Sequence, residues 1–159
     1  MVTKRTTCRA GMLTAVLLTA GISVRAQPNA DVAAVTAANN AFYSAISTLD
    51  PAAMEKVWSQ EPYVASIGPR SKTIAVGSVA VQESYKNDVM AMLAQLTARP
   101  VDAEVHVNGN VAWVIGKETS EGKMKDGSAF GGMNFVTSIF EKKDGRWLMV
   151  SHHAHRVPQ

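Results

Sequence analysis

The stretch that decides the fold is residues 130–157, FGGMNFVTSIFEKKDGRWLMVSHHAHRV. Lys143-Asp144-Gly145 near its centre is a tight-turn sequence between two apolar segments, which predicts a β-hairpin with strands at residues 130–141 and 146–157. Side chains alternate between the two faces of a strand. One face of this hairpin would carry Met133, Phe135, Ile139, Leu148 and Val150, and the other would carry Val136, Phe140, Trp147 and Met149. Both faces are apolar, so both need to be covered.

Two more strands are predicted before this hairpin. Residues 101–108 alternate between apolar and polar side chains, and Asn108-Gly109-Asn110 is a strong hairpin turn. The chain then returns as a strand over residues 111–119, and the glycine-containing residues 120–129 are expected to form a loop. Shorter strands are expected at residues 63–67 and 74–76.

The part of the chain that precedes residue 100 contains segments with helical periodicity. Residues 31–49 place apolar side chains at three- and four-residue steps, Asp50-Pro51 is a favourable start for a short second helix, and Ser78 would cap a third. The third helix is expected to carry Val81, Tyr85, Val89, Met92 and Leu96 on one side. Helices followed by a strand meander predict an α+β fold with the helices on one face of an antiparallel sheet.

The first 26 residues have the layout of a cleavable signal peptide. A basic start, an apolar run at residues 11–24 and the small residues of Val24-Arg25-Ala26 predict cleavage after Ala26, which leaves one domain at residues 27–159. The apolar run is shorter than the roughly 20 residues that span a bilayer. We therefore expect a periplasmic or secreted protein that has no membrane segment after cleavage.

Removal of the signal peptide changes the charge balance and the available chemistry. Of the 16 Lys and Arg residues, four lie in residues 1–26, so 12 remain against 13 Asp and Glu. A nearly neutral domain without a basic cluster argues against nucleic-acid binding. The single cysteine, Cys8, also precedes the predicted cleavage site, which excludes thiol chemistry from the mature protein.

The segment Lys143-Asp144-Gly145-Arg146-Trp147-Leu148-Met149-Val150-Ser151-His152-His153 resembles the end of SnoaL-like domains of the NTF2-like superfamily. Those domains end in a charged turn with glycine, a tryptophan, alternating aliphatic residues and a histidine, often as His-x-His. Here His153 matches the second histidine and Ser151 replaces the first. The resemblance implies a cone in which a curved antiparallel sheet is wrapped by about three N-terminal helices around a pocket. It also implies sheet-mediated dimers, which agrees with the two-faced hairpin and predicts a homodimer through the outer sheet face.

The histidines near the chain end are the candidates for catalysis. His153 and His155 share one strand face and His152 takes the other, so His152 or His153 could serve as a general base. The alternative is a structural histidine, with His153 packed beside Trp147 and Met149. No set of residues has diagnostic metal-ligand spacing, so we expect no metal and no cofactor. In the related ketosteroid isomerases a base carboxylate lies on the first strand, and residues 63–67 contain none, which argues against that chemistry.

Several aromatic and polar residues are candidates to line a small-molecule pocket, with core packing as the alternative for each aromatic one. They are Tyr43, Trp58, Tyr63, Trp113 and Asn134. Asn134 interrupts an apolar run and needs a partner if it is buried. We expect Glu118, at a strand end, to face solvent, with a pocket-facing position as the alternative, and we expect His106 to face solvent.

Three functions follow from this sequence. The first is an exported protein that binds a small, largely apolar molecule in the cone. The second is a cofactor-free isomerase, cyclase or hydrolase with a histidine base. The third is a dimeric assembly module with a vestigial pocket.

Overall fold

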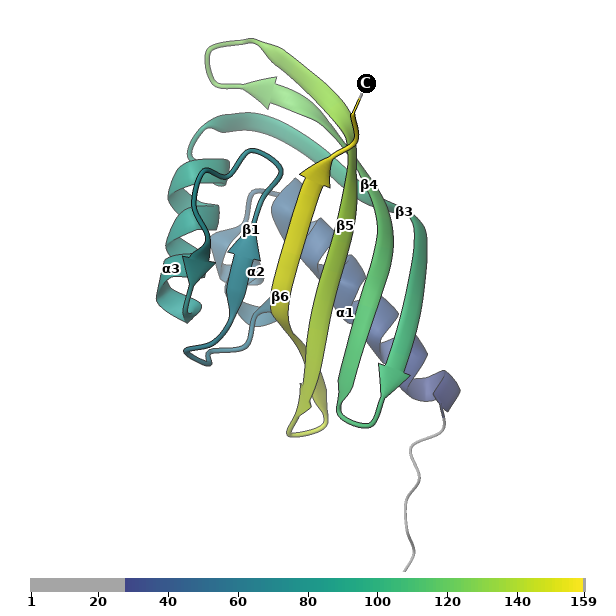
Figure 1. Cartoon of the computed structure of the whole chain (residues 1–159). Helices are drawn as coiled ribbons and strands as arrows, with labels where there is room; N and C mark the ends of the chain where they lie inside the picture. Colours follow the sequence, from purple (N-terminus) through teal and green to yellow (C-terminus); the bar gives the residue numbers. More distant parts are fainter. Residues whose placement is uncertain (1–27, 159) are drawn as a thin grey trace, which may run out of the picture.

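One curved, unclosed sheet of six strands forms the body of the protein in the computed structural model, which describes residues 28–158 (Figure 1). The strand order is β2-β1-β6-β5-β4-β3, and β1–β6 is the parallel pair among otherwise antiparallel neighbours. The strands are β1 (Ala65–Ile67), β2 (Ala75–Val76), β3 (Leu93–Asn108), β4 (Val111–Met124), β5 (Ala129–Lys143) and β6 (Arg146–Arg156). The predicted α+β fold is confirmed.

The helices cover one face of this sheet, which we call the inner face; the opposite side is the outer face. Helix α1 (Pro28–Ser47) runs behind the long strands, and α2 (Pro51–Val57) and α3 (Ser78–Glu83) lie beside β1 and β2 (Figure 1). Leu49, two residues after the end of α1, has a left-handed backbone (φ 53°). Asp50 then caps α2 by accepting hydrogen bonds from the backbone amides of Ala52 and Ala53.

The tryptophan of the terminal hairpin ties α1 to the sheet. Trp147 Nε1 donates to Asp31 Oδ1 at 3.1 Å, and Lys142 Nζ donates to the same oxygen at 2.6 Å. These two bonds lower the pKa of the Asp31 carboxyl. Because Asp31 lies in the first turn of α1, they fix the start of the helix beside the β5–β6 turn.

The third helix differs from its prediction. It ends as a π-helix (Ser84–Met90), and residues 93–96 belong to β3 rather than to the helix. Pro100, expected before the strand, lies inside β3 and pairs with Glu118. Proline is tolerated there because β3 is an edge strand whose outward amide needs no partner.

The loop expected at residues 120–129 is mostly strand. β4 continues to Met124 and β5 begins at Ala129, so only residues 125–128 form the turn. Gly122 permits this extension, because it faces the Gln95 carbonyl of β3 at a distance that leaves no room for a Cβ atom. A glycine-containing stretch that suggests a loop can therefore be a strand under a close backbone approach.

The predicted signal peptide, residues 1–26, lies outside the residues that the structure describes. Within residues 28–158, no helix combines the length and apolar character that crossing a bilayer requires.

We predict that Gly122→Ala destabilises the fold by about 1–3 kcal/mol, the usual cost of overpacking. The added methyl would overlap the Gln95 carbonyl and approach the Phe130 ring to 2.9 Å. Gly131→Ala is the matched control, because its nearest neighbour would be 3.6 Å away. Urea unfolding should show the loss for Gly122→Ala only; equal stabilities would contradict the close approach.

Candidate functional site

A buried carboxyl joins α1 to two strands on the inner face. Glu118 of β4 lies opposite Asn134 of β5, and the two residues are 7% and 3% exposed. Asn134 Nδ2 donates to Glu118 Oε1, and the Tyr43 hydroxyl of α1 donates to Oε2, each at 3.0 Å. The expectation that Glu118 faces solvent is wrong.

Burial and mutual contact shift the pKa values of both Glu118 and Tyr43. Burial raises the pKa of the Glu118 carboxyl, and the hydrogen bonds from Asn134 and Tyr43 oppose that rise. Burial and the adjacent Glu118 carboxyl raise the pKa of the Tyr43 hydroxyl. Tyr43 therefore remains a protonated donor at neutral pH, and both oxygens of Glu118 are engaged.

A second polar pair joins β5 and β6. His152 lies opposite Ser138 in the ladder, its Nδ1 atom is 3.0 Å from Ser138 Oγ, and its ring centroid is 4.6 Å from that of Phe42. Burial, assisted by the neighbouring His153, lowers the pKa of His152 to about 4. The imidazole is therefore neutral at neutral pH.

The partner of His152 leaves its second nitrogen available. A neutral imidazole has one donor and one acceptor nitrogen, and a serine hydroxyl can bond to either kind. Ser138 thus accommodates both tautomers. Nε2 has no hydrogen-bond partner among the described residues.

An aromatic cluster surrounds these polar pairs. Phe42 contacts the rings of Tyr43 and Tyr85 with centroids 5.2 and 5.8 Å apart, and Tyr85 also contacts Trp58 at 5.9 Å. The Tyr85 hydroxyl is 3.1 Å from Ser66 Oγ on β1. We call Phe42, Tyr43, Trp58, Tyr85 and His152 the interior cluster. Trp58 is 1% exposed, and its Nε1 donor has no hydrogen-bond partner in the part of the chain that the structure describes.

A β-bulge decides which histidine enters this cluster. Phe140 pairs with Met149 and Ile139 pairs with Ser151, so Val150 is an extra residue in β6. The extra residue shifts the alternation by one position. His152 consequently joins Trp147 and Met149 on the inner face, while His153 and His155 are exposed. The alternative in which His153 packs beside Trp147 and Met149 is wrong, and the prediction that His152 faces opposite to His153 and His155 is confirmed.

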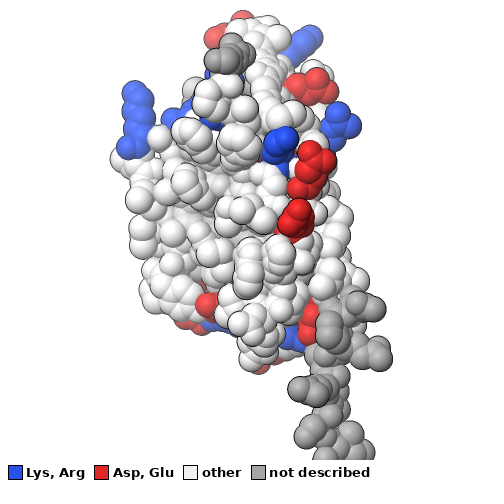
Figure 2. Space-filling view, turned by 45° about the vertical axis from the view of Figure 1, so that its right-hand side comes forward, with Lys and Arg blue, Asp and Glu red and all other residues white. Residues whose placement is uncertain are grey.

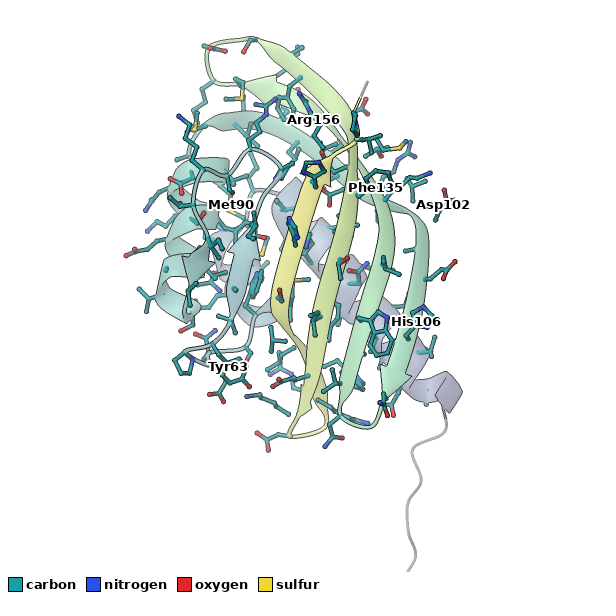
Figure 3. All side chains as sticks on the ribbon, viewed as in Figure 1. Tyr63, Met90, Asp102, His106, Phe135 and Arg156 are labelled. Carbon is teal, nitrogen blue, oxygen red and sulfur yellow. The ribbon has the colours of Figure 1, made fainter. Side chains whose placement is uncertain are left out.

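The structure brings together some of the predicted pocket residues and separates others. Tyr43, Trp58 and Asn134 lie within or beside the interior cluster. Tyr63 is 52% exposed and donates to Glu141 near the β5–β6 turn. Trp113 is 38% exposed on the outer face and stacks on His106, which faces solvent as expected (Figure 3).

The sequence did not identify Ser138 as a site residue, and it offered a pocket-facing Glu118 only as the alternative to a solvated one. Their positions carried a usable pattern, because Glu118 is in phase with the buried Ala112 and Val114 of β4. The opposite phase, however, holds Val111, Trp113 and Ile115. With both phases apolar, alternation alone could not identify the inner one.

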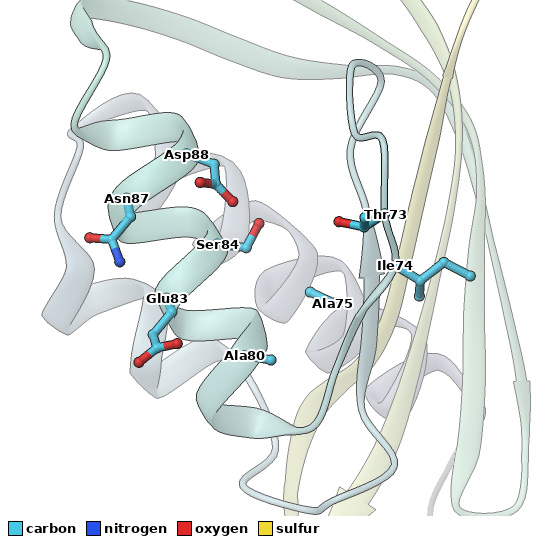
Figure 4. A pocket seen from close by; sticks show the side chains of 8 residues that line it. All are labelled: Thr73, Ile74, Ala75, Ala80, Glu83, Ser84, Asn87 and Asp88. Atoms are coloured by element: carbon cyan, nitrogen blue, oxygen red, sulfur yellow. The ribbon is translucent and has the colours of Figure 1, made fainter.

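Two surface hollows lie away from the interior cluster. One, of about 340 Å³, lies between β2 and the helix that α3 forms with the following π-helix. It is lined by polar side chains such as Glu83, Ser84 and Asp88 (Figure 4). The other, of about 240 Å³, lies beside Arg99 and Thr119. Within residues 28–158, no three His, Cys, Asp or Glu side chains gather in a way that could hold a metal ion.

Known structures share this curved sheet and its helices. A candidate dehydratase of the NTF2-like family from Streptomyces avermitilis is 24% identical, with a TM-score of 0.75 over 84% of this chain and 100% of that one. An NTF2-like superfamily protein from Salmonella enterica is 18% identical, with a TM-score of 0.77 over 84% of this chain and 95% of that one. A hexachlorocyclohexane dehydrochlorinase from Novosphingobium barchaimii is 14% identical, with a TM-score of 0.69 over 82% and 97%.

These likenesses define the NTF2-like fold class. Within it, residues 35–157 match the model of the SnoaL-like domain, and the chain belongs to that family. A comparison with curated proteins returns no match.

We predict that His152 makes the fold sensitive to acid. Its pKa falls from 6.5 to about 4 on folding, so the unfolded chain takes up a proton first as the pH drops below 6.5. The stability contribution is present above pH 6.5 and declines by about 3 kcal/mol toward pH 4.

Urea unfolding at pH 7, 5.5 and 4.5 measures this effect. His152→Gln should flatten the decline relative to the unsubstituted protein, whereas His155→Gln, at an exposed position, should leave it unchanged. Parallel curves for all three proteins would show that His152 protonates as easily in the folded state as in the unfolded one.

Proposed function

We propose that this protein binds a small, largely apolar molecule at the interior cluster, between α1 and the inner face of the sheet. The observation that carries the proposal is the Trp58 Nε1 donor, which is buried without a hydrogen-bond partner. Buried polar groups are almost always paired, so an unpaired one needs an explanation such as a bound ligand. An acceptor on the ligand would supply the missing bond, and the surrounding rings would contact its apolar body.

The likeness to a dehydrochlorinase named for hexachlorocyclohexane agrees with this size and polarity of ligand, since that compound is small and apolar. The amino-terminal layout supports export to the periplasm or the medium as part of the same proposal.

Proton transfer to or from the bound molecule is the second candidate function. It is favoured by His152, which is buried, neutral at neutral pH and held by Ser138 through Nδ1. Its Nε2 atom could then accept or donate a proton without a cofactor. This reaction class includes isomerisation and elimination.

A homodimer through the outer face is the third part of the proposal. Large apolar side chains are exposed together on β4 and β5: Val111, Trp113, Ile115, Met133 and Phe135. Figure 2 shows a broad area over the strands without charged side chains, bordered by both acidic and basic groups. An apolar sheet face that no helix within residues 28–158 covers is typical of a subunit interface.

Native mass spectrometry of the protein purified from its own host tests ligand binding. We expect an added small-molecule mass on the protein, and we expect Trp58→Phe to lose most of it because the indole donor is removed while an aromatic ring stays. Trp113→Phe, on the outer face, is the control and should retain it. An empty interior in the unsubstituted protein would refute the binding proposal.

The same experiment separates binding from catalysis. His152→Gln removes the proton-transfer group and fills a similar volume. If His152 catalyses a reaction, this variant should retain a molecule different in mass from that retained by the unsubstituted protein, or retain it at higher occupancy. Identical ligands at equal occupancy would leave binding alone as the function.

The dimer is tested by light scattering at micromolar concentration. We expect twice the chain mass for the unsubstituted protein and a monomer for Phe135→Lys, because a lysine at this 47% exposed position would be desolvated in the interface. Ile74→Lys, exposed near β2 and away from the outer face of β4 and β5, should remain dimeric. An unsubstituted protein that is monomeric would contradict this interface.

A further inference from the structure

We infer that Arg70 and Arg156 form an entrance that binds the oxyanion head of the ligand, so that the ligand class is a small apolar body carrying a carboxylate. This inference rests on the proposed binding function, which names only the apolar part. It concerns the inner face beyond the interior cluster, at the end of β6 and the start of β5.

Arg156 lies on the inner face although it is the last residue of β6. The β5–β6 register is continuous from Asn134–Arg156 to Ser138–His152. Arg156 therefore has the same phase as the buried His152 and Ala154. Its guanidinium lies over Gly132, where an added Cβ would be 3.4 Å from Arg156 Nη2. Figure 3 shows Arg156 beside the region where β4 and β5 curl over.

Arg70 contacts the same strand, β5, from a different part of the chain. It lies in the connection between β1 and β2, and its guanidinium carbon is 5.4 Å from the ring centroid of Phe130. Phe130 and Gly132 share the phase of the buried Asn134, because the β4–β5 register has no irregularity in this region. They are two residues apart on β5, about 7 Å along the strand. The two guanidinium groups therefore lie against residues two positions apart on one face of β5.

These two positive charges have no acidic partner within the described residues, where no carboxylate oxygen lies within 4.0 Å of either arginine. Glu118 is the acidic group on the same face of β4, and both of its oxygens are already engaged by Asn134 and Tyr43. Two neighbouring like charges repel each other, and a bound anion would remove that repulsion. Guanidinium groups match a carboxylate through paired N–H donors.

The strand spacing limits the length of the ligand. His152 and Arg156 are four residues apart on β6, about 13 Å along the strand. An arginine side chain can fold back over part of that distance. A carboxylate at the arginines would thus lie about the length of one or two rings from the interior cluster, which sets the size of the apolar body.

Isothermal titration calorimetry with 2-naphthoate and with 2-naphthamide tests the inference, because the two probes differ in charge and share their apolar body. We expect the full-length protein to bind 2-naphthoate roughly tenfold more tightly than it binds 2-naphthamide. Arg156→Gln and Arg70→Gln should each reduce 2-naphthoate affinity by roughly tenfold and leave 2-naphthamide affinity unchanged. Arg146→Gln is the control, because Arg146 is exposed at the start of β6, at the opposite end of the strand from Arg156.

The remaining outcomes separate the two proposals. Equal affinities for the two probes, or variants that keep the preference for 2-naphthoate, would overturn the arginine entrance and leave interior binding intact. Inorganic sulfate that binds as tightly as 2-naphthoate would overturn the link between the entrance and an apolar body. Absence of binding by both probes would also overturn the entrance, and native mass spectrometry would then show independently whether the interior holds another ligand. Both arginines are exposed, so the variants should fold, and circular dichroism checks this.

Discussion

The extra residue at Val150 is the constraint on which the candidate site depends. β6 has to place Trp147 and Met149 inside, because Trp147 holds the start of α1 through Asp31 and Met149 is fully buried. Strict alternation would then put His153 inside and His152 outside. The bulge between Met149 and Ser151 reverses the phase, so His152 faces inward while the hairpin keeps its tryptophan. One additional residue thereby lets a single strand serve both the anchoring of α1 and the site.

A buried carboxyl is the second constraint, since it is costly unless its oxygens are bonded. Glu118 meets this requirement with donors from two different elements, α1 and β5. The arrangement therefore fixes α1 in rotation and translation over the sheet: Tyr43 has to reach the carboxyl, while Asp31, twelve residues earlier, has to reach Trp147. A helix held at two such points covers the inner face in one register, which keeps Phe42 against His152.

The sequence was sufficient to predict the α+β fold, the β3–β4 and β5–β6 hairpins and the SnoaL-like family, because turn residues and apolar alternation are local features. It was less informative where a local pattern had two readings. Residues 93–96 continue a helical stripe, yet they pair with β4 along an edge where Pro100 is tolerated. Asn134 was identified as a residue that needs a partner, but Glu118 could not be, because both phases of β4 are apolar. The assignment of His152 required the bulge, which has no turn residue to mark it.

The polar residues on the inner face of β5 need an explanation other than packing. From Phe130 to Phe140, the inner positions read Phe, Gly, Asn, Val, Ser and Phe. A face that only packs against helices needs no polar side chain, and each buried one costs free energy unless it is paired. The two polar positions are paired, and each partner is an ionisable group on a neighbouring strand: Asn134 with Glu118 and Ser138 with His152. The glycine between them and Phe130 leaves space for Arg156. Every departure from an apolar pattern on this face thus supports a charged or titratable side chain, which folding alone does not require.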